Sequence, residues 1–98
     1  MNKKNDIQEH INHVAHETLL QILNDPRHYA RFVETYRHAV KACPELGYRG
    51  HITAATIAVF LRLDFSGIDE AGTAADHQSE CVSRAVEMVA DYFEGETL

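Results

Sequence analysis

The chain has only two cysteines among its 98 residues, Cys43 and Cys81, and they form no CxxC pair. This usage indicates small buried side chains in a reducing compartment rather than a disulfide framework. The first ten residues, MNKKNDIQEH, contain no apolar run that could serve as the core of a signal peptide. We therefore expect a cytoplasmic protein.

Long apolar runs are also missing. The most apolar stretch, Ile52–Leu63, has twelve residues, of which only Thr53, Thr56 and Arg62 are polar. A bilayer-spanning helix needs about 20 such residues, so we expect no membrane span. A helix that is apolar on nearly every side has to be surrounded by other elements. The stretch therefore predicts the buried central helix of a small domain.

The common catalytic and nucleotide-binding motifs are absent from the sequence. It has no GxGxxG, GxxxxGK[ST], GxSxG or HExxH motif and no calcium-binding loop of the EF-hand type. Ser66, Ser79 and Ser83 show no pattern of partners that suggests a nucleophile. A site assembled in space needs no local motif, so these absences favour a non-catalytic protein without excluding an enzyme. We expect no cofactor.

What is present is helical periodicity. Apolar residues recur at steps of three and four near the start of the chain, at Ile7, Ile11, Val14, Thr18 and Ile22. Asp25 is a good N-cap for a second helix that begins at Pro26. Thr53 is the expected N-cap of the third helix, after a loop CPELGYRG, and Thr73 with Asp76 suggests a loose capping pattern for the fourth.

The predicted helices span about 6–23, 26–43, 53–63 and 74–94, with a loop over 64–72. The β-branched content of the third segment leaves a strand as the alternative, but no other segment offers a strand partner. Length, composition and the lack of a repeat or linker predict a single domain, 1–98. The fold class is all-α: a small four-helix bundle-like domain with a short apolar third helix at its centre.

Charge is distributed unevenly along the chain. Residues 26–63 carry six basic against two acidic side chains, a net charge of +4 with histidine counted as neutral. Residues 64–98 carry one basic against nine acidic side chains, a net charge of −8. The segment after the central helix is therefore the acidic part of the molecule.

The acidic face of the fourth helix comprises Glu80, Glu87, Asp91 and Glu94. One interpretation is a docking surface for a basic partner, because such a surface speeds association and suppresses wrong partners. The other is a solvated face that pairs with the basic second helix, within or between subunits, where each exposed pair contributes below about 1 kcal/mol.

A basic stripe on the second helix comprises Arg27, Arg31, His38 and Lys41, with Glu34 among them. Together with the Arg49 loop it is an alternative contact for DNA or RNA. A nucleic-acid-binding helix usually carries a denser basic patch. A helix-turn-helix would have to use the apolar third or the acidic fourth helix for recognition. We do not expect direct nucleic-acid binding.

The first alternative to a protein-interaction module is a metal-binding helical bundle that uses a stripe on the first helix, and nucleic-acid contact is the second. Asp6, His10, His13 and Glu17 fall within about 60° of one another on a helical projection, and His and carboxylate groups bind divalent metals. This face lies about 120° from the apolar face. Bundle metal sites instead use inward ligands from several helices, often as Glu-x-x-His, which is absent here. We expect a solvated face.

The second helix also displays aromatic and apolar residues, at Tyr29, Phe32, Val33 and Tyr36. This is more aromatic surface than four short helices can cover, and an isologous homodimer would bury the excess. The sequence as a whole predicts a small acidic interaction module: an adaptor, or an inhibitor or regulator, of a basic protein such as one that handles nucleic acid.

Overall fold

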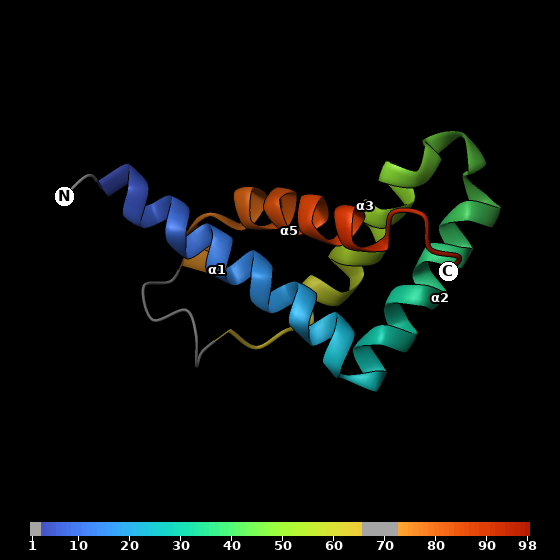
Figure 1. Ribbon diagram of the computed structural model, residues 1–98, viewed down its shortest axis with the longest axis horizontal. Helices are drawn as coiled ribbons and strands as arrows, with labels where there is room; N and C mark the ends of the chain where they lie inside the picture. Colours follow the sequence, from blue (N-terminus) through green and yellow to red (C-terminus); the bar gives the residue numbers. More distant parts are fainter. Residues whose placement is uncertain (1–2, 66–72) are drawn as a thin grey trace.

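The computed structural model describes residues 3–65 and 73–98 (Figure 1). Its elements are α1 (Lys3–Asn24), α2 (Pro26–Ala42), a short 3-10 helix η1 (Pro44–Leu46), α3 (Gly47–Phe60), α4 (Thr73–Asp76) and α5 (Gln78–Phe93). Every regular element among the described residues is helical, which confirms the predicted all-α fold.

The four long helices form two pairs, α1 with α5 and α2 with α3. α1 and α5 lie side by side and run in the same direction along the long axis, whereas α2 and α3 fold back on each other through η1 (Figure 1). α3 also packs against α5, and α1 packs against α2. The molecule is elongated, with extents of 46 × 25 × 21 Å.

The central position of α3 is confirmed by its burial. Ile52, Ala55 and Val59 are fully buried and belong to a cluster with residues of the other long helices, namely Ile22, Phe32, Val86, Val89, Ala90 and Phe93. Phe60 lies in a second cluster with Ile11, Val14 and Cys81. The two clusters together join all four long helices around α3.

The start of α3 differs from the prediction. The helix begins at Gly47, not near Thr53, and the hydroxyl of Thr53 donates a hydrogen bond to the carbonyl of Arg49 within the helix, at 2.7 Å. The two glycines that suggested a loop have other roles. Gly47 has a φ of 71°, which marks the entry to the helix, and a Cβ at Gly50 would lie 2.7 Å from the Cβ of Leu46. The absence of a Cβ at position 50 therefore lets the first turn form.

The predicted fourth helix is two helices. His77, with φ −124° and ψ 41°, separates α4 from α5, so the continuous helix predicted over 74–94 is wrong at this residue. Asp64 and Phe65 have no regular structure, in line with the predicted loop, whose remaining residues 66–72 lie outside the described residues. The capping pattern predicted for Thr73 involves a side chain that is also outside them.

Candidate interaction surface

The four acidic residues predicted on the last helix gather on one exposed face of α5. Glu80, Glu87, Asp91 and Glu94, here called the acidic stripe, are all exposed, and Glu94 forms the C-cap. At about 100° and 1.5 Å per residue, they lie within about 60° of one another over about 20 Å. The stripe runs almost the full length of the helix.

An open polar groove follows the stripe where α1 and α5 meet. Its volume is about 560 Å³, and both helices line it, with three residues from α1 and five from α5, two of which belong to the stripe: Gln8, Ile11, Asn12, Ser79, Glu80, Ser83, Arg84 and Glu87. The sequence did not reveal Gln8 or Asn12, because only the packing of α1 beside α5 brings them next to the acidic residues. We call this feature the α1–α5 groove.

Arg84 organises the wall of this groove. Its Nε donates to Oδ1 of Asn12 at 3.0 Å, and its Nη1 donates to Oε2 of Glu87 at 2.8 Å. The same Asn12 oxygen accepts a hydrogen bond from Nε2 of Gln8 at 3.1 Å. The arginine therefore ties α5 to α1 and neutralises one member of the acidic stripe.

The other three carboxylates of the acidic stripe, Glu80, Asp91 and Glu94, form no ion pair with any residue that the structure describes. The ion pairs predicted between the basic second helix and this face are likewise not found among the described residues. The charge of the stripe is therefore mostly left to solvent or to another molecule.

Aromatic side chains lie at the C-terminal end of the stripe. The hydroxyl of Tyr48 donates to the carbonyl of Ala90 at 2.7 Å and links α3 to α5. Burial raises the pKa of Tyr48, and the nearby Tyr36, Glu94 and Asp91 raise it further. Tyr92, which follows Asp91, is 55% exposed. The acidic surface therefore carries an exposed aromatic ring at its edge.

The basic stripe on α2 is interrupted by an acidic residue. Arg27 and half-buried Arg31 lie in the first turns of the helix, whereas His38 and Lys41 are exposed near its other end. Exposed Glu34 lies between the two pairs. Arg49 belongs to the first turn of α3 rather than to a loop. The continuous basic face that a nucleic acid would follow is thus interrupted.

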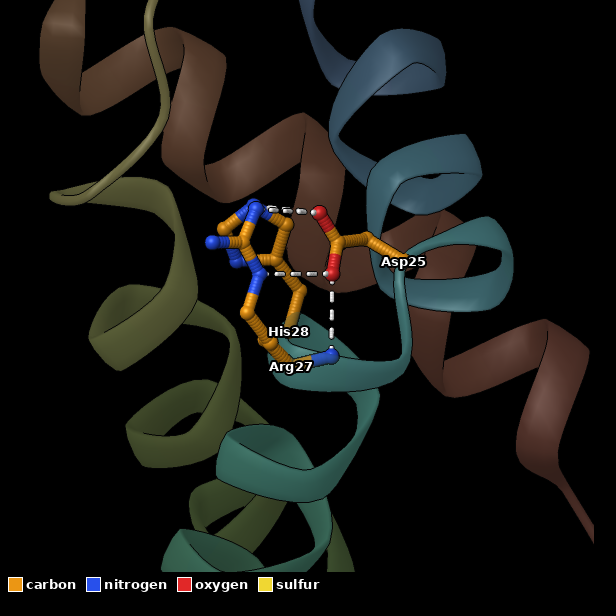
Figure 2. Close-up of polar contacts among 3 residues, drawn as sticks. All are labelled: Asp25, Arg27 and His28. Carbon is orange, nitrogen blue, oxygen red and sulfur yellow. Dashed lines mark hydrogen bonds and ion pairs between the residues drawn. The ribbon is translucent and has the colours of Figure 1, made fainter.

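Arg27 is already engaged at the start of α2. Figure 2 shows Asp25 with Arg27 and His28: the carboxylate accepts from the Arg27 amide at 2.9 Å and pairs with its guanidinium at 3.3 Å and with the His28 ring at 3.6 Å. The hydrogen bonds from Arg27 hold the pKa of Asp25 below its ordinary value. The predicted N-cap is confirmed, and its carboxylate is paired with Arg27, the first residue of the basic stripe.

This arrangement predicts a loss of stability in acid. Because the folded-state pKa of Asp25 is lowered, its ionised form stabilises the fold above its unfolded pKa of about 4, and this stabilisation is lost as the pH falls through the lower folded value. Asp25→Asn keeps a capping oxygen without the charge. We expect this variant to melt a few degrees below the wild type at neutral pH and at the same temperature in strong acid. Thermal melts at both pH values decide this, and a constant difference would contradict the explanation.

The histidine-containing stripe on α1 lies away from the core. Asp6, His10 and His13 are exposed, and Glu17 is half-buried. Among the residues that the structure describes, no group of three or more His, Cys, Asp or Glu side chains is placed to hold a metal ion. The side chains that could bind a metal here come from one helix, which leaves α1 without ligands from its neighbours.

The residues on which the homodimer prediction rests mostly pack against other residues of the same chain. Phe32 is fully buried and stacks on Phe93 with ring centroids 5.1 Å apart, while Val33 and Tyr36 pack partly buried against the same cluster. Tyr29 is 41% exposed and remains available to another molecule. Homodimerisation stays a prediction, and the exposed aromatic surface that supports it is smaller than the sequence suggested.

No described helix combines the length and the apolar character that crossing a membrane requires. No protein-family model matches the chain, and neither the curated proteins nor the solved structures yielded a match.

Proposed function

We propose that the protein is a small non-catalytic interaction module that binds a basic protein through the acidic stripe and the α1–α5 groove. The observation that carries this proposal is the group of four exposed carboxylates on α5, three of which form no ion pair with a described residue. The polar groove beside them adds hydrogen-bonding groups from Gln8, Ser79 and Ser83.

The physical basis is electrostatic complementarity. A row of like charges about 20 Å long attracts lysine and arginine side chains presented by a helix or an extended segment of the partner. Such attraction raises the association rate and weakens as salt increases. Arg84 sits within the stripe, so a partner arginine that approaches Glu87 has to share or replace an existing pair. This requirement selects partners with several basic groups over single cations.

The proposed role is that of an adaptor, or of an inhibitor or regulator, of a basic protein. A protein that handles nucleic acid fits this description, because a row of carboxylates offers its basic surface the same sign of charge as a phosphate backbone. We place the interaction in the cytoplasm, with support from the low cysteine content of the sequence, which has no CxxC pair. Identification of the partner starts with capture from an extract of the native host on the untagged protein.

Charge reversal tests the proposal on the captured partner. Glu87→Lys with Asp91→Lys is expected to weaken binding by at least about tenfold, equivalent to about 1.4 kcal/mol, and to reduce the dependence of the dissociation constant on salt. The control is Asp6→Lys with Glu34→Lys, which changes the net charge equally at exposed residues of α1 and α2. Isothermal titration at several salt concentrations measures both quantities.

The control double variant distinguishes an effect of the acidic stripe on binding from an effect of net charge. If the two double variants bind the partner equally well, the interaction depends on overall charge or on another surface, and the proposed docking site is wrong. Circular dichroism of each variant shows that the comparison is made between folded proteins.

A further inference from the structure

A second open groove lies between the start of α2 and the residues that follow α3. Its volume is about 810 Å³, and Arg27, Arg31 and Arg62 line it together with Asp25, Glu34 and Asp64. It is formed by a different part of the molecule from the α1–α5 groove, and three arginines line it where Arg84 is the single arginine of the α1–α5 groove. We call it the arginine groove.

Arg31, which lines this groove, has an unsatisfied donor. Its Nε is buried and has no hydrogen-bond partner among the residues that the structure describes. A buried donor left unpaired destabilises the folded protein, and does so more when it belongs to a charged group. Such groups are rare in folded proteins, and a missing ion is one of their ordinary explanations. The guanidinium of Arg31 therefore has at least one donor without an acceptor among the described residues, and the same side chain lines the open groove.

The carboxylates in the arginine groove do not supply that acceptor. Asp25 is engaged by Arg27 and His28. Asp64 makes an interaction of its own, and Glu34 is exposed and forms no ion pair with a described residue. Arg31 and Arg62 consequently face the same open volume, without an ion pair to any residue that the structure describes.

We propose that the arginine groove binds an oxyanion, the phosphate or carboxylate group of a small molecule, with Arg31 and Arg62 as its main ligands. A guanidinium is planar and offers parallel N–H donors, which match the paired oxygens of both kinds of anion. The α2 amide of Arg27 is already bonded to Asp25, so the site depends on side-chain guanidinium groups and not on the helix end. This site is additional to the proposed protein-docking function and independent of it.

The side-chain Nε–Hε signals of the arginines report the site directly. The full-length protein, labelled with nitrogen-15, is titrated with inorganic pyrophosphate and, in a second series, with citrate at constant ionic strength. We expect the Arg31 signal to move downfield and to saturate, with a smaller change at Arg62 and none at exposed Arg49 of α3. Saturation by pyrophosphate alone assigns the site to phosphate, and saturation by citrate alone assigns it to carboxylate.

Two variants test the roles of the arginines. Arg31→Lys keeps the charge but removes the Nε donor and the planar fork, and we expect about tenfold weaker binding of the effective anion. Arg62→Gln is expected to weaken it comparably, whereas Arg49→Lys, the matched control, leaves it unchanged. If Arg31→Lys does not fold, the wild-type titration and Arg62→Gln decide the matter alone.

The proposal is overturned by either of two results. One is an Arg31 signal that stays in place at millimolar pyrophosphate and citrate, or that moves only as much as that of Arg49, which is the behaviour of simple charge screening. The other is a folded Arg31→Lys variant that binds the anion as tightly as the wild type.

Discussion

Val59→Asp is expected to leave the protein unfolded at room temperature. Val59 is 0% exposed and lies in the central cluster of α3. A buried carboxylate without a partner either stays charged at a cost of several kcal/mol or takes up a proton, and it also loses the packing of the valine. Small proteins have a total stability of about 5–15 kcal/mol, so one such change removes most of it. Far-ultraviolet circular dichroism and a thermal melt measure the result.

Leu61→Asp is the matched control for this prediction. Leu61 follows α3 as its C-cap, two residues after Val59, and is 64% exposed. The same charge there stays in water, so we expect a melting temperature within a few degrees of the wild type. A cooperative melt of Val59→Asp close to that of Leu61→Asp would show that α3 is not the helix on which the others depend.

Phe32→Ala is expected to lower the free energy of unfolding by about 3–5 kcal/mol. Phe32 is 0% exposed, and its ring stacks on Phe93 of α5 with an interplanar angle of 24°. Its removal leaves a cavity between α2, α3 and α5, because the helices around it are also fixed by Ile52 and Val89. Urea denaturation followed by circular dichroism gives the change in free energy.

Tyr29→Ala, on the same helix, separates packing from helix propensity. Tyr29 is 41% exposed, so its replacement by alanine removes fewer packing contacts. We expect the free energy of unfolding to fall by less than about 1 kcal/mol. Equal losses for the two variants would mean that Phe32 contributes no more than any aromatic residue of α2, contrary to the observed core. A larger effect of Tyr29→Ala at high protein concentration would instead support the predicted homodimer.

Local patterns in the sequence predicted the helices well. The apolar spacing of α1 identified Ile11, Val14 and Ile22, which are buried, because a period of 3.6 residues reflects one face of one helix. Asp25 and Pro26 predicted the break between α1 and α2 for a similar reason, since a cap and a proline act within a single turn.

Features that depend on neighbouring turns or helices were less predictable. Gly50 looked like a loop residue, whereas its missing Cβ makes room for Leu46 in the first turn of α3. His77 carries no proline or glycine signal that would mark the break between α4 and α5. Ile7 belongs to the apolar pattern of α1 but is 41% exposed, since it lies near the free end of the helix.

In the candidate sites too, residues on one helix face could be predicted from sequence, whereas contacts between helices could not. The acidic stripe could be identified from sequence, because its four residues share one helix face. Asn12 could not, since its bond to Arg84 spans 72 residues of the chain. Arg62 was noticed only as the single charge in the apolar segment, and only the fold brings it into the same groove as Arg31.

The most direct test of the docking surface is a map of the bound partner on the nitrogen-15-labelled protein. Backbone amide shifts are compared between the free protein and its complex with the captured basic partner. The proposed function predicts that the largest changes fall on the α1–α5 groove and the acidic stripe, at Asn12, Glu80, Ser83, Glu87 and Asp91. Changes confined to α2 and the arginine groove, with α5 unaffected, would contradict it.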